Sequence, residues 1–458
     1  MTLGYHRKRK EFTTTRIIAL GFLGAILIGT LLLMLPISSA TGSVTNFVDS
    51  LFTATTSVCV TGLVTVPTYA HWSIFGQVVI VLLIQIGGLG VITFTMLFMM
   101  LLGKKIGLKQ RLLIQDAYNL DTIQGMIVLI RKVVRGTLIV EGIGALLYMT
   151  VFVPQFGWSG IWKSLFNAVS AFCNAGMDVL GPDSLMPYAG NLIVNITTML
   201  LIVLGGIGFP VWWSVLDMFR ERRRRHQTLG MGVRHLPLHT KMVLFLTFSL
   251  ILGGALLVLV LEWNNPQTMG NMPLWEKIQA SFFQSITTRT AGFLTISQAG
   301  LRKGTVLICC ILMFIGGSPS GTAGGVKTTT VAILLLTVVS IIKGRNDTEM
   351  FERKISGNLV RRALSIFMVS FGVMMTAVIA LAIVQPGDFL DCLFEVTSAI
   401  ATVGLSRDFT TQLTLAGRII IIVTMYIGRI GPISLALFFN AKRFVNLKTY
   451  PEEKVGVG

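Results

Sequence analysis

Four short, half-polar segments that each end in a glycine carry the most specific chemical pattern in this chain. Each segment begins at a Phe and reaches its glycine ten residues later; the pairs are Phe52 and Gly62, Phe166 and Gly176, Phe282 and Gly292, and Phe394 and Gly404. The glycines recur at intervals of roughly one quarter of the chain, which indicates one structural unit used four times. A single glycine would indicate only a tight turn or close helix packing. Four in register favour a shared function.

We predict that this shared function is the binding of a desolvated cation by backbone carbonyls. Carbonyl oxygens that face a water-filled cavity can replace the hydration shell of K⁺, and glycine allows the backbone angles that this arrangement needs. The predicted ion-binding residues are Val60, Thr61, Gly62, Asn174, Ala175, Gly176, Thr290, Ala291, Gly292, Thr402, Val403 and Gly404. Asn174-Ala175-Gly176 lacks Thr, so we expect looser coordination there.

The elements that position these loops must lie in a membrane. The 458 residues are 53% hydrophobic and 13% charged, whereas soluble domains are about a quarter charged. Apolar runs of spanning length lie near 17–37, 74–101, 133–153, 191–216, 241–262, 304–342, 361–384 and 415–440. We therefore predict an all-α polytopic membrane protein with eight spans and four re-entrant pore helices. Its units are 1–102, 103–217, 218–343 and 344–441, followed by a tail at 442–458.

The distribution of basic residues predicts the orientation in the membrane. Lys and Arg total 38 against 20 Asp and Glu. Most of these bases lie before the first span, in three loops that would share its side, and after the last span, which predicts cytoplasmic termini in the cell membrane. A nucleic-acid groove is therefore not indicated, although anionic lipid is an expected contact for the basic loops.

Two features predicted to lie on the cytoplasmic side of the glycine segments indicate a gate. The run 304–342 is about twice the length needed to span, and its Gly- and Pro-rich middle predicts a helix interrupted inside the membrane. The candidate gate residues are Gly316, Gly317, Ser318, Gly321, Thr322, Gly324, Gly325, Lys327 and Arg429. A charge as deep as Arg429 is a functional candidate as a barrier to cations; the alternative is an ion pair with Glu395 or another buried acid. Arg289 more simply braces the third loop by hydrogen bonds.

These motifs resemble the Trk/Ktr/HKT superfamily of potassium transporters, and most closely the membrane subunit of the bacterial Ktr system. The resemblance covers nearly the whole chain and is most specific at Thr290-Ala291-Gly292-Phe293, at Gly316 to Lys327, at Ala401 to Leu405 and at Ile427 to Pro432. It implies four helix–pore-loop–helix units around one pathway, with a filter built from Gly62, Gly176, Gly292 and Gly404. It also implies a movable gate loop, a homodimer and a cytoplasmic ring of nucleotide-binding regulatory subunits.

The alternatives are a sodium-permeable or sodium-coupled transporter of the same fold, a carrier for organic solutes and a membrane enzyme. Sodium-selective members of the superfamily can carry Ser at the first filter position, where this chain has Gly62. A solute carrier would use a roomy midplane site and usually inverted repeats. An enzyme would need paired carboxylates, a His cluster or an activated nucleophile in the spans, and the sequence indicates none.

Overall fold

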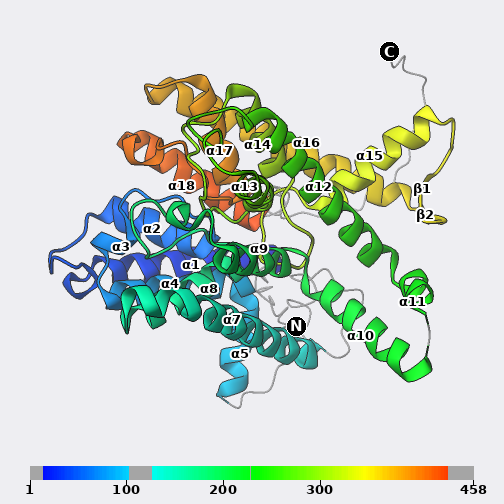
Figure 1. Ribbon diagram of the computed structural model, residues 1–458, viewed down its shortest axis with the longest axis horizontal. Helices are drawn as coiled ribbons and strands as arrows, with labels where there is room; N and C mark the ends of the chain where they lie inside the picture. Colours follow the sequence, from blue (N-terminus) through cyan, green and yellow to red (C-terminus); the bar gives the residue numbers. More distant parts are fainter. Residues whose placement is uncertain (1–13, 103–125, 227, 432–458) are drawn as a thin grey trace, which may run out of the picture.

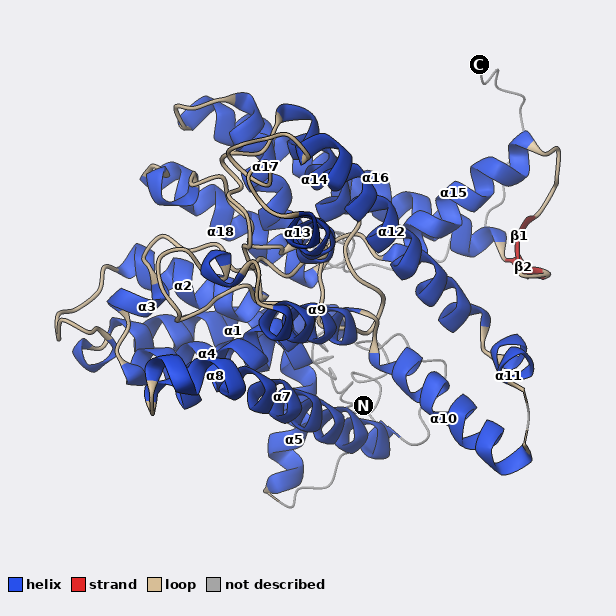
Figure 2. Cartoon of the chain, viewed as in Figure 1, coloured by secondary structure: helices blue, strands red, loops and turns tan. Residues whose placement is uncertain are grey.

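The computed structural model describes residues 14–102, 126–226 and 228–431, and this part of the chain is built mainly from α-helices (Figures 1 and 2). The α-helices of the first half are α1 (Thr14–Met34), α2 (Phe47–Cys59), α3 (Thr68–His71), α4 (Ile74–Leu89), α5 (Val91–Leu101), α7 (Met126–Phe156), α8 (Ser159–Cys173), α9 (Leu192–Gly206) and α10 (Phe209–Arg225). Those of the second half are α11 (Leu229–His235), α12 (Leu238–Glu262), α13 (Leu274–Thr287), α14 (Lys303–Phe314), α15 (Thr328–Ile342), α16 (Gly357–Val384), α17 (Phe389–Ala401) and α18 (Leu415–Ile430). Short 3-10 turns lie at Pro36–Ser38, Met186–Tyr188 and Thr410–Gln412, and β1 (Thr348–Met350) pairs antiparallel with β2 (Arg353–Ile355).

The helices follow the same order four times. A long apolar helix leads into a short helix of 13 to 15 residues, a glycine loop follows, and a second apolar helix returns. The four units are α1–α2–α4, α7–α8–α9, α12–α13–α14 and α16–α17–α18. We refer to them below as units one to four.

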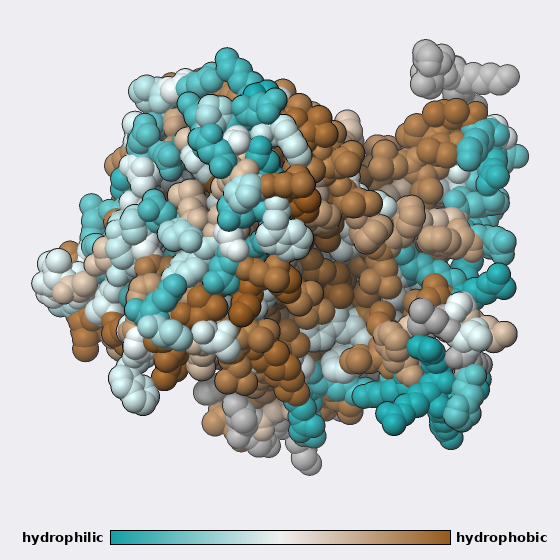
Figure 3. Space-filling model, viewed as in Figure 1, coloured by the Kyte–Doolittle hydropathy of each residue, from teal (hydrophilic) through white to brown (hydrophobic). Residues whose placement is uncertain are grey.

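The first helix of each unit has the length and composition of a membrane span. Arg16–Met34, Ile127–Phe156, Leu238–Glu262 and Gly357–Val384 meet both conditions, whereas α4, α14 and α15 are apolar but shorter. Figure 3 shows apolar side chains gathered over the middle of the face around α12 and α16. Polar side chains gather over α10, α11 and the β-hairpin at one end and over the connecting loops at the other. This banding is what a protein surrounded by hydrocarbon requires.

The second helix is broken in more units than the sequence predicted. A break was expected only in 304–342, where α14 and α15 are indeed separated. The runs 74–101 and 191–216 were each given as one span with no break expected, but the structure interrupts them at Gly90 and at Ile207-Gly208, and α10 turns 101° from α9. Gly90, Gly208 and Gly431 share φ values of 86°, 89° and 92°, which residues with a side chain rarely adopt. The predicted span 415–440 ends its helix before Gly431, and its remainder lies outside the described residues.

In units one, two and four a glycine in the second apolar helix, 24 to 29 residues after the loop glycine, allows this helix to pack against the glycine loop. A Cβ atom at Gly87, Gly205 or Gly428 would collide with the backbone carbonyl of Val58, Phe172 or Ile400, respectively. Each of those carbonyls lies four residues before the glycine that ends its loop. In unit three Gly316 instead packs against the carbonyl of Gly324, within the break itself.

This packing predicts that Gly428→Ala destabilises the fold. The added methyl group would lie against the Ile400 backbone, and overpacking of this kind costs about 1–3 kcal/mol. The thermal unfolding temperature of the detergent-solubilised protein should therefore fall. Gly372→Ala is the matched control, because Gly372 lies inside α16 with open space around it and should gain about 0.5–1 kcal/mol. Equal stability of the two variants would contradict the packing argument.

Candidate functional site

The structure brings the four predicted loop glycines together into one closed ring. A Cβ atom at each glycine would meet the carbonyl oxygen of the residue that precedes another glycine of the set. The contacts run from Gly62 to Ala175, from Gly176 to Ala291 at 2.5 Å, from Gly292 to Val403 at 2.5 Å, and from Gly404 to Thr61. We call Gly62, Gly176, Gly292 and Gly404 the glycine ring. All four have positive φ, between 66° and 101°.

The residues two positions before the ring glycines also have an unusual backbone. Val60, Asn174, Thr290 and Thr402 all adopt left-handed φ angles of 52° to 68°. Asn tolerates this region, but it is costly for the β-branched Val and Thr, and such strain clusters at functional sites. The intervening Thr61, Ala175, Ala291 and Val403 are fully buried. All twelve predicted filter residues therefore share one local geometry in four copies.

The short helices direct their carboxyl ends toward the ring. α2 ends at Cys59, α8 at Cys173 and α17 at Ala401, each three residues before a ring glycine, and α13 ends slightly earlier at Thr287. The carboxyl end of a helix carries a partial negative charge, so four such ends favour a cation at their meeting point.

Hydroxyl groups of the short helices hold the loops in place, and sequence reasoning missed them. The Gly62 amide donates to Thr56 Oγ1 at 2.9 Å, and the Gly404 amide donates to Ser398 Oγ at 3.0 Å. The Met177 amide donates to Ser170 Oγ at 3.1 Å. Thr56, Ser170 and Ser398 all lie six residues before a ring glycine, so the signal was present in the repeat.

The third unit departs from this register by one residue. Phe52, Phe166 and Phe394 are fully buried as the repeat predicts, but Phe282 is only partly buried and Phe283 takes the core position. The anchoring hydroxyl shifts with it, because Thr287 Oγ1 donates to the Phe293 carbonyl at 2.7 Å. The prediction that Phe282 corresponds to the other three was therefore wrong by one position.

The candidate gate loop, residues 316–327, folds back on itself between α14 and α15. Its two ends pair as a short parallel bridge between Ile315 and Val326. The Gly317 amide donates to the Gly324 carbonyl at 3.2 Å, and Ser318 Oγ lies 3.0 Å from Thr328 Oγ1. A Cβ atom at Gly324 would collide with Thr402 Oγ1, so the loop lies directly against the fourth glycine loop.

Unit two holds the other side of this loop. The Ser318 and Thr322 amides donate to the carbonyls of Gly206 and Gly205 at 2.9 and 3.0 Å. Thr322 Oγ1 donates to the Phe172 carbonyl at 3.1 Å, and a Cβ atom at Gly321 would lie 2.9 Å from the Gly205 oxygen. The loop therefore occupies the space at the α9–α10 break.

Arg429 connects this loop to unit one. Its guanidinium donates to the carbonyl of Thr322 at 2.7 Å and to the carbonyl of Gly87. The alternative of an ion pair with Glu395 is contradicted, since Glu395 instead accepts hydrogen bonds from Ser406 and Thr410. The second base of the region, Lys327, donates to the Ala323 carbonyl at 2.7 Å, beside the positive-φ Gly325.

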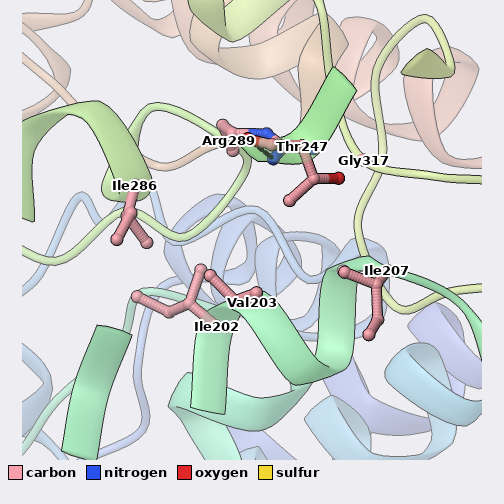
Figure 4. A pocket seen from close by; sticks show the side chains of 8 residues that line it. Ile202, Val203, Ile207, Thr247, Ile286, Arg289 and Gly317 are labelled. Atoms are coloured by element: carbon pink, nitrogen blue, oxygen red, sulfur yellow. Dashed lines mark hydrogen bonds between the residues drawn. The ribbon is translucent and has the colours of Figure 1, made fainter. Parts of the chain in front are cut away.

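Arg289 takes a different position, behind the third glycine loop. Its Nη1 donates to the Thr247 carbonyl of α12 at 3.4 Å, which supports the predicted bracing role. Figure 4 shows Arg289 and Thr247 across a small cavity from Ile202, Val203 and Ile207, with Gly317 at its edge.

Several acidic side chains near the ends of helices are paired or buried. Asp49 pairs with Arg418 at 2.7 Å, Asp391 pairs with Arg407, and Glu262 is fully buried among hydrogen-bond donors. Burial raises the pKa of the Asp178 carboxyl above its ordinary value, so this acid keeps its proton to higher pH than an exposed aspartate.

Four glycine loops that meet inside a protein with long apolar helices define a helical membrane protein with irregular backbone at its centre. Comparison with known proteins agrees with that class. A family model described as a cation transport protein matches residues 9–445, and the chain belongs to this family, the TrkH family. It is accordingly a transport protein and not an enzyme.

Individual relatives cover nearly the whole chain. It is 42% identical over 449 residues to the Ktr system potassium uptake protein B of Bacillus subtilis, covering 98% of this chain and 97% of that protein. It is 39% identical to the potassium/sodium uptake protein NtpJ of Enterococcus hirae over the full length of both. The crystal structure of the potassium transporter TrkH from Vibrio parahaemolyticus matches with a TM-score of 0.68 at 16% identity. That match covers 94% of this chain and 86% of the TrkH chain, and it shows a shared fold.

The Asp49–Arg418 pair predicts measurable coupling between units one and four. Both side chains are more than two-thirds buried, and Asp49 also accepts from Thr65 Oγ1 at 2.9 Å. A double-mutant cycle with Asp49→Asn and Arg418→Gln should give a coupling free energy of about 1–2 kcal/mol. The exposed Asp217–Arg220 pair is the control and should give about 0–0.5 kcal/mol. A coupling no larger than that of the control would contradict a structural role for the pair.

Proposed function

We propose that this protein takes up potassium across the cell membrane through the glycine ring. The observation that carries the proposal is the ring itself, in which four loops from one chain meet and each glycine lies against a backbone carbonyl of a neighbouring loop. The names of the relatives in Bacillus subtilis and Enterococcus hirae support potassium as the transported ion. K⁺ would bind at the carbonyls of the twelve filter residues predicted from the sequence.

The proposal includes the full membrane arrangement. The four units occupy 1–102, 103–217, 218–343 and 344–441, and together they make eight spans and four re-entrant pore helices, the latter being α2, α8, α13 and α17. Both termini lie in the cytoplasm, as the basic loops indicate. The four long helices and the apolar band of the surface support this arrangement.

The loop 316–327 is the gate in this proposal. It lies against the fourth glycine loop on one side and against the α9–α10 break on the other, so it would obstruct a path leading from the ring. Arg429 keeps it in place through the Thr322 carbonyl and adds a positive charge that opposes cation passage.

The partners in this proposal are a second copy of the chain, the lipid bilayer and a cytoplasmic ring of nucleotide-binding regulatory subunits. The regulatory ring follows from the family resemblance and from the relative's name as one protein of a Ktr system. The exposed arginines Arg222, Arg223, Arg224 and Arg225 at the end of α10 offer a basic surface on the predicted cytoplasmic side.

A sodium-permeable or sodium-coupled transporter is the second candidate function. The name of the Enterococcus hirae relative, a potassium/sodium uptake protein, favours it. Independent variation of K⁺ and Na⁺ in a vesicle flux assay separates the two functions, because only the second predicts Na⁺ entry or a requirement for Na⁺.

Replacement of a ring glycine by serine tests the filter. Gly62→Ser and Gly404→Ser would each push a side chain against a neighbouring carbonyl and force a strained φ. We expect K⁺ uptake to fall at least about tenfold, or the preference for K⁺ over Na⁺ to fall by a similar factor, since about 1.4 kcal/mol suffices for either. Ion flux into vesicles containing the purified protein measures both.

Gly253→Ser is the control for these variants, since Gly253 lies in α12 with open space around it. It should transport as the unaltered protein does. Unchanged uptake and selectivity in both ring variants would refute the filter.

Removal of the Arg429 side chain tests the gate. Arg429→Ala loses two hydrogen bonds to carbonyls and one positive charge, which should favour loop displacement. A shift of about 1 kcal/mol would raise K⁺ flux about fivefold. Arg429→Lys keeps the charge but loses the paired geometry, so it should give an intermediate rate. Stopped-flow flux measurements decide the matter, and rates equal to those of the unaltered protein in both variants would exclude a gating role.

A further inference from the structure

The fourth pore helix carries a polar stripe that faces its own glycine loop. Asp391, Glu395 and Ser398 lie at positions i, i+4 and i+7 of α17, so they share one face of the helix. Asp391 pairs with Arg407, Glu395 accepts from Ser406, and Ser398 accepts from the Gly404 amide. The partners of Asp391, Glu395 and Ser398 are Arg407, Ser406 and Gly404, in that order. Members of the stripe that lie closer to the carboxyl end of the helix therefore bind residues closer to the ring glycine.

Glu395 is the central member of this stripe and is fully buried. Its exposed fraction is 0%, and each carboxylate oxygen accepts a hydroxyl hydrogen bond. Ser406 Oγ donates to Oε2 at 2.8 Å, and Thr410 Oγ1 donates to Oε1. The Ser406 oxygen also accepts the Phe409 and Thr410 amides, so the whole turn that follows Gly404 depends on this carboxylate.

The equivalent positions in the other units carry neutral side chains. Thr53 and Asn167 lie nine residues before their ring glycines, as Glu395 does. Gln284 occupies the equivalent position in unit three after its one-residue shift, and it exchanges hydrogen bonds of 2.7 and 3.0 Å with Gln298. The Asn167 amide finds no partner within the described part of the chain. Among these four equivalent positions, all of which the structure describes, only the one in unit four therefore carries a carboxylate.

We propose that Glu395 is a positioning residue that sets the discrimination between K⁺ and Na⁺ by holding the fourth glycine loop at a fixed distance from the ring centre. The inference rests on the proposed function of the ring. Hydrogen bonds to a carboxylate are shorter and stronger than those between neutral groups, so they restrain the loop more tightly. Discrimination between the two ions depends on the position and stiffness of the carbonyls around them, and Glu395 acts on both without contacting the ion.

The test compares Glu395→Gln with the unaltered protein in vesicles, with K⁺ and Na⁺ flux measured separately. Glutamine keeps the volume but replaces one acceptor oxygen by a donor, so one of the two hydroxyl contacts is lost. We expect the ratio of Na⁺ to K⁺ flux to rise about fivefold or more, with K⁺ flux itself changed less. Ser406→Ala removes the partner closest to the ring and should shift the ratio in the same direction.

Glu262→Gln is the matched control. Glu262 is also fully buried and also accepts from two hydroxyls, those of Thr268 at 2.7 Å and of Thr305, but it lies at the end of α12 and contacts no residue of the ring. Its variant should unfold at lower temperature and keep the ion ratio. This separates a general loss of stability from a specific effect on the filter.

The outcomes distinguish this inference from the proposed function. If Gly404→Ser alters selectivity while Glu395→Gln and Ser406→Ala do not, the role of Glu395 is overturned and the filter stands. If Glu262→Gln shifts the ratio as much as Glu395→Gln does, the effect is general and the inference is likewise overturned. If Gly404→Ser has no effect either, the filter itself fails. Should Glu395→Gln not fold, Ser406→Ala alone decides the inference.

Discussion

The closed set of backbone contacts among the four ring glycines is the constraint on which the rest of the structure depends. Each glycine lies against the carbonyl of a neighbouring loop, so a side chain at any one position would separate two units of the chain. Loops that pack this closely cannot provide hydrogen-bond partners for all of one another's backbone N–H and C=O groups. They therefore need donors and acceptors from the short helices, and Thr56, Ser170 and Ser398 supply acceptors at equivalent places.

The same constraint explains why the second helix is interrupted in units one to three and why α18 ends before Gly431 in unit four. Gly87, Gly205 and Gly428 let these helices approach the loops from behind, and positive-φ glycines end or bend three of them just below. In unit three the interruption grows into the loop 316–327, which takes hydrogen bonds from units two and four. The second helices that surround the ring are thus copies of one element. The candidate gate is the loop at the break of the copy in unit three, where the interruption is longest.

Much of this architecture could be predicted from the sequence, because a glycine that recurs at the same place in four segments is far more informative than a single glycine. The four ring glycines and the break near Gly316 are cases of this kind. The breaks at Gly90 and Gly208 were not predicted, since the glycines of 87–90 and 205–208 are equally compatible with close packing of a continuous membrane helix. The partners of Arg429 were also inaccessible: they are backbone carbonyls, and any residue type supplies one. The predicted equivalence of Phe282 with the other three Phe residues was wrong because α13 ends two residues earlier, relative to its ring glycine, than the other short helices do. The spacing of residues in the sequence does not reveal where a helix ends.

Direct location of the bound ion tests the central claim most sharply. Rb⁺ can be located by anomalous diffraction in crystals grown with Rb⁺ in place of K⁺. The account predicts a peak on the axis of the glycine ring, within coordination distance of the carbonyls of Thr61, Ala175, Ala291 and Val403, and a weaker peak when Na⁺ competes. A strong Rb⁺ peak elsewhere in the membrane region, with none at the ring, would contradict it.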